Sequence, residues 1–234
     1  MKTVIFDLDG TLLPMDQEEF TRAYFKALST RMARFGYDPQ KLVKAVWDGT
    51  RAMIANDGAR SNFDAFWDGF AAVFGDKAYD DIPLFDEFYE TDFHTLKSVC
   101  GFTLDAARLI KKLKAAGCRL VLASNPIFPK VAHINRMRWA GLDENDFCYI
   151  TSYENSNYCK PKAGYYSDIL RDIGEVAENC IMVGNDVSDD MPARDIGIGV
   201  FLLTDCLINT KNVDISADPH GGYAELNKFL DEHI

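Results

Sequence analysis

Two acidic side chains follow the first apolar run of this chain and are candidates for catalysis. The run Val4–Phe6 is followed by Asp7 and Asp9, and then by Gly10 and Thr11. One carboxylate of such a pair can attack phosphorus while the second handles protons. Gly10 lets the chain turn sharply, so that backbone N–H groups face an anion. A solvated turn is the alternative, because Asp, Gly and Thr are common turn residues.

Two polar side chains follow a second apolar run, residues 119–123. These are Ser124 and Asn125, and Pro126 comes next. A hydroxyl and an amide at such a position can donate hydrogen bonds to phosphoryl oxygens. A helix cap before the proline explains the same residues equally well. Their position after Asp7 in the chain favours phosphate binding.

Basic and acidic side chains complete the set of candidate site residues. Lys160 and Lys162 flank a proline, and Asp186, Asp189 and Asp190 follow the apolar run 180–184. Carboxylates this close repel one another without a cation. Hard oxygen ligands of this kind suit Mg²⁺, which keeps several waters and binds through a few carboxylates plus substrate phosphate. A surface lysine before a helix remains the alternative for either lysine, and we expect Asp189 to be solvated at a helix start.

These side chains need a scaffold that brings strand ends together. The apolar runs predict buried strands, and helical periodicity lies between them. The predicted strands cover residues 4–6, 119–123, 147–150, 180–184 and 198–203, and the predicted helices cover 104–117, 129–140, 163–173 and 223–230. Alternation of this kind indicates a doubly wound parallel α/β sheet, in which ligands bind at the carboxyl ends of the strands.

The stretch between the first two strands has a different pattern. Helical spacing begins at a capping sequence from Asp16 and continues through segments starting near residues 39, 61 and 83, with no strand pattern between them. We therefore expect an all-helical cap over residues 15–98, inserted into an α/β core of residues 1–14 and 99–234. Its aromatic stripes are explained mainly by packing. Arg51 and Arg60 could reach a substrate, although solvated loop arginines explain them more simply.

The sequence Asp7-Leu8-Asp9-Gly10-Thr11 resembles the first motif of the haloacid dehalogenase-like hydrolase superfamily, most of whose members are phosphatases. The resemblance implies that Asp7 is the nucleophile and Asp9 the general acid/base. A helical cap after the first strand also matches the layout of the family. The later strand ends supply a hydroxyl, a lysine and acids in the family's order, so the resemblance extends over essentially the whole chain.

The later motifs carry further implied roles. Ser124 and Asn125, together with Gly10 and Thr11, would bind the phosphate. Lys160 matches the motif lysine because a proline follows it, and Lys162 is the fallback. Asp186 and Asp190 match the two acids of the fourth motif. Mg²⁺ would be held by Asp7, Asp186 and the backbone carbonyl of Asp9, while Asp190 would position Lys160 or a water.

The activity implied is a magnesium-dependent phosphatase acting on a small phosphorylated metabolite through an aspartyl-phosphate. A phosphosugar mutase or phosphotransferase would use the same intermediate. A haloacid dehalogenase needs neither Mg²⁺ nor a second acid at position 9, so Asp9 and the acids near Asp186 disfavour it. A non-catalytic phosphoacceptor domain is disfavoured because its aspartate lies in mid-chain and it lacks so large a helical insertion.

Composition limits the partners and the compartment. The 234 residues carry a formal net charge of −11, which argues against nucleic-acid or anionic membrane surfaces. The six cysteines form no C-x-x-C pair and are typical of reduced thiols. No signal peptide or membrane span is recognisable. We expect a cytoplasmic protein that is a monomer or a small homo-oligomer.

Overall fold

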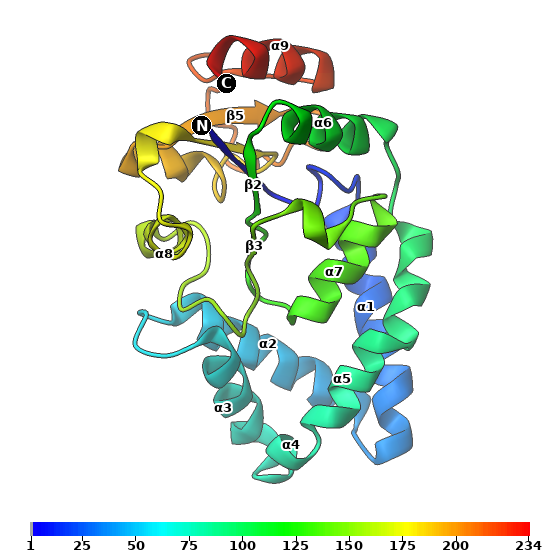
Figure 1. Cartoon of the computed structure of the whole chain (residues 1–234). Helices are drawn as coiled ribbons and strands as arrows, with labels where there is room; N and C mark the ends of the chain where they lie inside the picture. The colour runs from blue at the N-terminus through cyan, green and yellow to red at the C-terminus, as the bar shows by residue number, and fades with distance from the viewer. Residues whose placement is uncertain (1) are drawn as a thin grey trace.

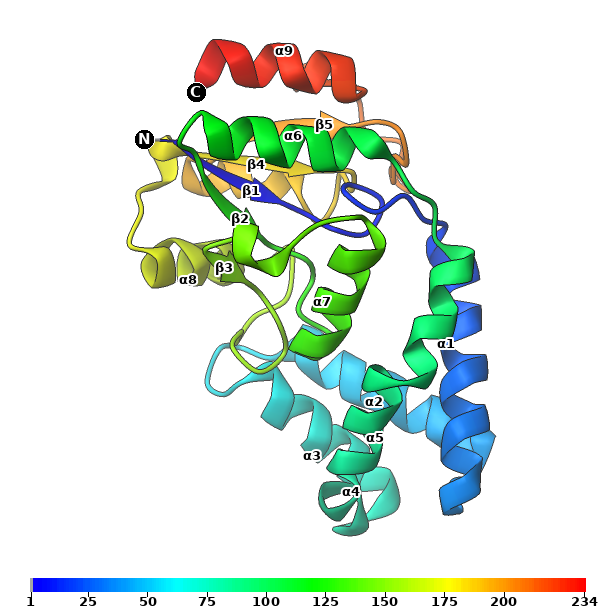
Figure 2. The same cartoon turned by 45° about the vertical axis from the view of Figure 1, so that its right-hand side comes forward.

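A single parallel sheet forms the centre of the computed structural model, which describes residues 2–234. The strand order is β3-β2-β1-β4-β5-β6, and every pairing is parallel. The strands are β1 (Thr3–Phe6), β2 (Arg119–Leu122), β3 (Tyr149–Ile150), β4 (Cys180–Gly184), β5 (Gly199–Leu203) and β6 (His220–Gly221). The predicted α/β fold class is confirmed. The order places β1 between β2 and β4, so that three predicted motifs end side by side. The sheet lies in the upper part of the molecule in Figure 1, and these three strands are labelled in Figure 2.

Helices cover both faces of the sheet, which explains the continuous apolar runs of the strands. Val4 and Phe6 point into one hydrophobic cluster and Ile5 into another, because successive side chains of a strand face opposite sides. In Figure 2, α6 and α9 lie over one face and α8 lies on the other. The core helices are α6 (Leu104–Ala115), α7 (Lys130–Trp139), α8 (Ala163–Ile173) and α9 (Tyr223–His233), with short 3₁₀ turns η3 (Glu144–Asp146), η4 (Ala177–Asn179) and η5 (Met191–Ile196).

The chain between β1 and α6 is helical, as its periodicity predicts. Its elements are α1 (Gln17–Met32), η1 (Ala33–Phe35), α2 (Pro39–Ala55), α3 (Asn62–Phe74), α4 (Lys77–Asp80), α5 (Ile82–Glu90) and η2 (Asp92–Val99). Side chains of Asp16, Asp38 and Ser61 cap the first turns of α1, α2 and α3 by accepting backbone N–H bonds. We call residues 15–98 the helical segment; its treatment as a separate cap domain stays a prediction.

Several element boundaries differ from the sequence prediction. The helix predicted to begin near residue 83 begins at Ile82 and ends at Glu90, and the 3₁₀ helix η2 follows it from Asp92 to Val99. The strand predicted over 147–150 is paired only over Tyr149–Ile150. The short helix α4 and the two-residue strand β6 were not predicted, because elements this short have no detectable periodicity.

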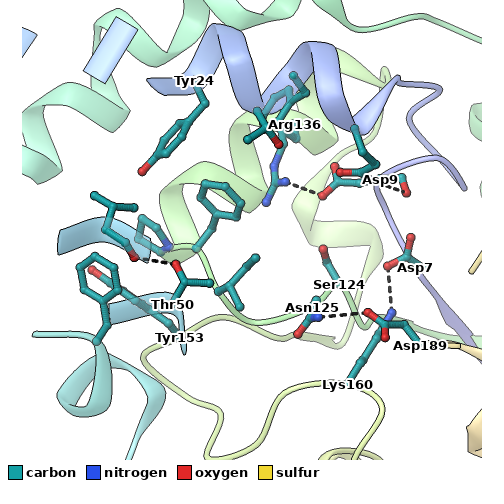
Figure 3. A pocket seen from close by; sticks show the side chains of 18 of the residues that line it. Asp7, Asp9, Tyr24, Thr50, Ser124, Asn125, Arg136, Tyr153, Lys160 and Asp189 are labelled. Carbon is teal, nitrogen blue, oxygen red and sulfur yellow. Dashed lines mark hydrogen bonds and ion pairs between the residues drawn. The ribbon is translucent and has the colours of Figure 1, made fainter. Parts of the chain in front are cut away.

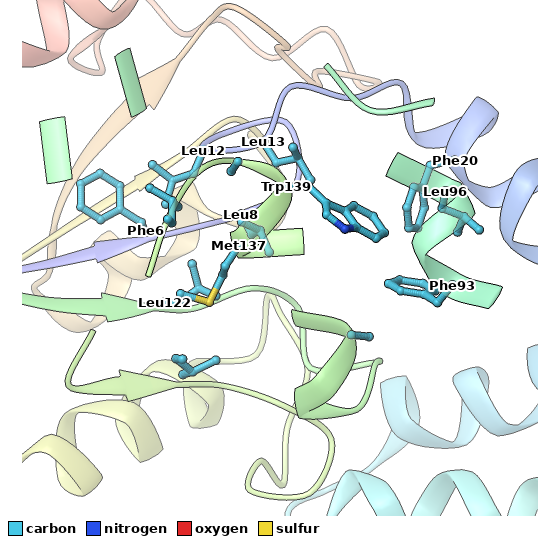
Figure 4. Close-up of a cluster of buried hydrophobic side chains, with 14 of the residues drawn as sticks. Phe6, Leu8, Leu12, Leu13, Phe20, Phe93, Leu96, Leu122, Met137 and Trp139 are labelled. Carbon is cyan, nitrogen blue, oxygen red and sulfur yellow. The ribbon is translucent and has the colours of Figure 1, made fainter. Parts of the chain in front are cut away.

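The helical segment contacts the core in two places, and an aromatic cluster forms the first of them. Phe93 stacks on Trp139 at 5.2 Å between ring centroids, and Tyr24 meets the edge of Phe128 at 5.4 Å. Figure 4 shows Trp139 between Phe93 and the leucines that follow β1. On the opposite side, the backbone N–H of Phe63 donates to the carbonyl of Tyr153 at 2.7 Å. The helical segment is therefore attached to the core at two places.

No helix among residues 2–234 is both long and apolar enough to cross a lipid bilayer.

Candidate active site

Asp7 lies at the carboxyl edge of the sheet, at the end of its central strand. Phe6 is in register with Leu122 of β2 and Val183 of β4. The backbone N–H of Asp7 still donates to the carbonyl of Val183 at 2.9 Å, so its position is fixed by the sheet. Ser124 follows β2 by two residues. Parallel register therefore brings these chain segments to one edge.

The turn after Asp7 depends on a glycine and on an asparagine that sequence analysis did not single out. Gly10 has a φ of +86°, and a Cβ atom there would lie 2.3 Å from Nδ2 of Asn185. The Thr11 hydroxyl lies 2.9 Å from Oδ1 of Asn185 and 3.2 Å from Oδ2 of Asp7. Asn185 also donates to the carbonyl of Cys206 at 2.7 Å. The first and fourth predicted motifs are thus tied together through Asn185.

The structure distinguishes the two candidate lysines. Nζ of Lys160 lies 2.9 Å from Oδ1 of Asp7 and 2.6 Å from Oδ1 of Asp190. Nζ of Lys162 instead donates to the backbone carbonyl of Asn56 in the helical segment at 2.5 Å. Lys160 is therefore the lysine beside Asp7, and the predicted partnership of Asp190 with this lysine is found.

The loop after β4 folds its acids back on its own backbone. Oδ1 of Asp186 accepts the N–H groups of Ser188 at 2.7 Å and Asp189 at 3.1 Å. Oδ2 of Asp190 accepts the N–H of Asp186 at 2.9 Å. A Cβ on Gly184 would lie 2.1 Å from Oδ2 of Asp190, so the small residue makes room for this carboxylate. The two acids predicted as a pair therefore share one tight turn.

Ser124 and Asn125 also face the edge. Ser124 is buried, and its carbonyl accepts the hydroxyls of Thr151 at 2.7 Å and Tyr165 at 2.9 Å. Asn125 donates to Oδ2 of Asp189 at 3.3 Å, while its buried Oδ1 has no partner among residues 2–234. Asp189 was expected to be solvated, but it is half-buried and lines the cavity described below. The hydrogen bond from the Asn125 amide holds the Asp189 carboxylate at the cavity.

Arg136 is the residue of the site that sequence analysis missed most clearly. It is 1% exposed, and its guanidinium forms an ion pair with Oδ2 of Asp9. Its Nη2 lies 3.0 Å from Nδ1 of His133, and its Cζ lies 4.6 Å from the centroid of the Phe128 ring. Arginine only donates hydrogen bonds, so Nδ1 of His133 accepts and the proton of the neutral imidazole sits on Nε2.

A signal for this arginine exists in the sequence. Arg136 stands between Ala132 and Ala140 at a spacing of four residues, on the apolar face of the predicted helix 129–140. An arginine on a buried face requires a buried acceptor. The acceptor lies 127 positions away, which a pattern within one helix cannot reveal.

The charges at this edge perturb one another strongly. Burial raises the pKa of Asp7 to about 7; the Lys160 ammonium opposes this shift, while Asp190 and Asp9 add to it. Burial would lower the pKa of Lys160, but the carboxylates of Asp190 and Asp7 outweigh it and raise that pKa well above its ordinary value. Burial also raises the pKa of Asp186. A bound cation would favour the ionised carboxylates.

The donor chemistry of the edge fits a hard divalent cation. Asp7 and Asp186 supply carboxylates, and the carbonyl of Asp9 follows in the turn. No three His, Cys, Asp or Glu side chains among residues 2–234 are grouped closely enough to hold a metal by themselves. A cation here would take further ligands from backbone, water or substrate, which is the usual manner of Mg²⁺.

A cavity of about 310 Å³ extends from these acids to the helical segment. Its floor contains Asp7, Asp9, Lys160 and the acids after β4, and its opposite wall is mainly aromatic. Figure 3 shows Asp7 and Lys160 on one side, with Thr50 and Tyr153 on the far side. The size is at the lower end of the range for small-molecule sites.

Neither of the arginines considered in the helical segment lines this cavity. Arg51 is paired with Asp48 on the exposed surface of α2, and Arg60 is paired with Asp68. Both pairs are neighbours on the helical segment itself. The structure therefore supports the simpler interpretation of these arginines as surface residues.

Comparison with protein-family models identifies one family. A family model described as haloacid dehalogenase-like hydrolase matches residues 1–197. No curated protein matches the chain.

Solved structures share the fold at low sequence identity. A 2-haloacid dehalogenase from Pseudomonas syringae pv. tomato aligns with a TM-score of 0.64 and 20% identity, covering 99% of each chain. A HAD phosphatase from Thermococcus onnurineus has a TM-score of 0.59 and 19% identity over 98% of each chain. YfnB from Bacillus subtilis, a HAD hydrolase described as bound to magnesium, has a TM-score of 0.58 and 18% identity over 98% of each chain.

Proposed function

Because the chain belongs to the haloacid dehalogenase-like hydrolase family, we propose that it is a magnesium-dependent phosphatase for a small phosphorylated metabolite. The observation that carries the proposal is the position of Asp7. It lies at the end of the central strand and on the floor of the cavity, with the Lys160 ammonium 2.9 Å from its Oδ1. A carboxylate so placed meets the first requirement of an aspartyl-phosphate mechanism.

The proposed reaction has two steps. A carboxylate oxygen of Asp7 attacks phosphorus, the bond from phosphorus to the ester oxygen breaks, and Asp9 gives that oxygen a proton. Asp9 then takes a proton from a water as the water attacks phosphorus, which releases inorganic phosphate and regenerates Asp7. Lys160 neutralises charge on Asp7 and on the transferring group, and Asp190 positions Lys160.

The remaining residues of the edge would bind the phosphoryl oxygens. The Ser124 hydroxyl and the Asn125 amide line the cavity and supply neutral donors there. The backbone N–H groups of Gly10 and Thr11, which the sequence also predicts as phosphate donors, instead donate within the turn, to the carbonyls of Leu13 at 2.8 Å and Leu8 at 3.2 Å. Asp9 would itself be held in place by the Arg136 guanidinium. Donors fixed by sheet register and by buried ion pairs need little reorganisation when charge develops.

Mg²⁺ is part of the proposal. Asp7, Asp186 and the carbonyl of Asp9 would hold it, and when bound it would neutralise negative charge on the phosphoryl group. Support comes from the oxygen donors at this edge and from YfnB, whose structure is described as magnesium-bound.

A dehalogenase is the competing activity, because two of the similar structures are described as 2-haloacid dehalogenases. That reaction also begins with attack by an aspartate, but at carbon, and it needs no second acid. Here Asp9 is half-buried, is paired with Arg136 and lines the cavity beside Asp7. This arrangement favours the phosphatase. A phosphotransferase would share the first step and would differ in passing the phosphoryl group to an alcohol.

The test distinguishes the roles of Asp7 and Asp9 by measuring turnover of an aryl phosphate by variants of each residue in the presence of Mg²⁺. Asp7→Asn should abolish turnover, because no phosphoenzyme can form. Asp9→Asn should release a burst of phenol and then turn over slowly, because a good leaving group needs little protonation whereas hydrolysis of the intermediate needs a base. Acid quench and mass spectrometry should then find phosphate attached to Asp7.

Two results would contradict these roles. A burst that survives in Asp7→Asn would mean that the nucleophile lies elsewhere. Turnover of Asp9→Asn within about tenfold of wild type would be smaller than the usual contribution of a general acid/base, about a hundred- to ten-thousand-fold. Halide release from 2-chloropropionate without phosphatase activity would identify the dehalogenase.

A further inference from the structure

The wall of the cavity opposite Asp7 is built from aromatic side chains. Those of Tyr24, Trp47, Phe66, Trp67, Phe85 and Tyr153 line it. The four on the helices α2, α3 and α5 pack edge to face or tilted against neighbouring rings, as Trp67 does against Phe85 at 5.2 Å between centroids. Rings held in this way present a fixed apolar surface to whatever occupies the cavity.

The cations that line the cavity lie on its floor and are already paired. Lys160 contacts Asp7 and Asp190, and Arg136 contacts Asp9 and His133. Apart from these two, no lysine or arginine among residues 2–234 lines the cavity. A carboxylate or second phosphate on the substrate would be buried against the aromatic wall without a partner, which is strongly unfavourable.

The polar groups of the far wall are neutral, and most have partners. The Thr50 hydroxyl donates to the carbonyl of Val46 at 2.8 Å, and the hydroxyls of Tyr24 and Tyr89 lie 2.8 Å apart. The buried indole N–H of Trp67 lies near the Tyr153 hydroxyl but has no acceptor of good geometry among residues 2–234. Such groups suit a carbonyl, ether or hydroxyl oxygen and cannot neutralise an anion.

From these observations we propose that the substrate is a phosphomonoester whose organic group is uncharged and largely apolar. The inference rests on the proposed phosphatase function, and it adds the class of leaving group. The phosphate lies on the acidic, metal-binding floor, and the organic group lies against the aromatic wall of the helical segment. Its apolar atoms leave water on binding, which is favourable in proportion to the area buried.

Three primary alkyl phosphates test the class. 3,3-Dimethylbutyl phosphate is neutral beyond its phosphate, choline phosphate replaces its quaternary carbon by a cationic nitrogen, and 3-carboxypropyl phosphate carries an anion. We expect kcat/KM for the dimethylbutyl ester to exceed that for the carboxypropyl ester by at least about tenfold, since several carbon atoms are buried in one case and an unpaired charge in the other. Choline phosphate should also be the poorer substrate of the isosteric pair.

The order of the three rates decides the inference independently of the proposed function. Release of phosphate from any ester supports a phosphatase. A higher kcat/KM for the carboxypropyl ester would overturn the apolar class. A higher value for choline phosphate would show instead that the rings bind a cation through their faces. Hydrolysis of an aryl phosphate with none of the three esters would also overturn the inference.

A charge placed in the wall should shift the preference. Thr50→Lys adds a cation to the far side of the cavity, and it should raise the ratio of kcat/KM for the carboxypropyl ester over the dimethylbutyl ester by at least about tenfold. Ile54→Lys is the matched control, because this residue lies on the same helix with its side chain exposed. Thr21→Lys, at a half-buried lining position, replaces Thr50→Lys if that variant does not fold.

An unchanged ratio in folded Thr50→Lys and Thr21→Lys would show that the organic group does not lie against this wall.

Discussion

Arg136 holds the carboxylate that the proposed mechanism uses to move protons. In the pair with Asp9 the guanidinium is buried and the carboxylate half-buried, and the guanidinium also contacts the Ala132 carbonyl, His133 and the Phe128 ring. Removal of one partner from a buried pair leaves the other charge without compensation, which costs about 3–5 kcal/mol. The arginine is therefore expected to affect both stability and the placement of Asp9.

We expect Arg136→Met to lower the free energy of unfolding by about 3 kcal/mol. Asp9→Asn combined with Arg136→Met should lose less than the sum of the two single changes, because the double variant buries no unpaired charge. Denaturant titrations of the four proteins measure this coupling. Arg138→Met is the control: Arg138 lies two residues after Arg136 in the same helix, and its pair with Glu144 is exposed. This change should alter the free energy of unfolding by less than about 1 kcal/mol. Strict additivity would contradict the coupling.

His133 should make stability depend on pH. Burial first, and then the nearby charge of Arg136, hold its pKa well below the ordinary value. In the unfolded chain the imidazole takes up a proton near pH 6.5. Below that pH the unfolded state binds more protons than the folded state, so this contribution to stability is lost as the pH falls.

As the pH falls from about 6.5 to 5, we expect the free energy of unfolding of His133→Asn to rise relative to that of wild type. The change in this difference should be no more than about 1.36 kcal/mol per pH unit. Denaturant titrations of both proteins at pH 7.5, 6.5, 5.5 and 5.0 provide the difference. The raised pKa of Asp7 makes stability increase as the pH falls, which is opposite to the effect of His133. Both proteins contain Asp7, so its effect cancels in the difference between them. His220→Asn, at an exposed position, is the control. A difference that does not change with pH would contradict a buried neutral imidazole.

The aromatic wall depends on the close approach of α2 and α3. A Cβ on Gly49 would lie 2.6 Å from the Phe66 ring and 2.9 Å from the Phe66 carbonyl oxygen. A Cβ on Gly69 would lie 3.1 Å from Cα of Gly49. These two glycines let the helices approach, and the same helices carry Thr50 and Trp67 to the cavity.

Gly49→Ala should therefore lower the free energy of unfolding by about 1–2 kcal/mol, because the cost of overpacking exceeds the gain in helix propensity of about 1 kcal/mol. Gly69→Ala is the milder change and should lose less. Thermal or denaturant unfolding ranks the two variants. A Gly49→Ala variant that is more stable than wild type would mean that the helices can separate without loss of packing.

The chain has a net charge of −11, and five of its carboxylates lie on the floor of one cavity. Two side-chain cations lie there with them, Lys160 and Arg136. The excess negative charge would oppose a phosphate dianion unless a divalent cation joins it. The site should therefore work only when a metal is bound.

We expect excess chelator to abolish phosphatase activity and Mg²⁺ to restore it, with Ca²⁺ a poor substitute because its shell is larger and looser. Asp186→Ala should raise the Mg²⁺ concentration needed for half-maximal rate at least about tenfold while the chain stays folded. Rates measured over a range of Mg²⁺ concentrations test this. Asp195→Ala, at an exposed acid, is the control. Full activity in chelator, or an unchanged Mg²⁺ dependence in Asp186→Ala, would move the metal elsewhere.

Local patterns in the sequence determine much of this protein. The apolar run before Asp7 is a buried strand, and a strand buried on both faces must lie inside a parallel sheet with helices around it. The side chains after such strands meet at one edge, so Asp7, Ser124 and Asp186 could be assigned to one site without coordinates. The helical segment and its first cap, at Asp16, likewise follow from periodicity and helix-start residues.

Side chains that meet across long sequence separations could be identified only from the folded structure. The structure shows that Lys160, and not Lys162, contacts Asp7. It also shows the hydrogen bond between Thr11 and Asn185 and the ion pair between Arg136 and Asp9. Such pairs depend on register and on the way helices pack, and a pattern within one segment records neither. The same is true of the aromatic wall, because periodicity shows that a ring is buried but does not show whether it faces another ring or a cavity.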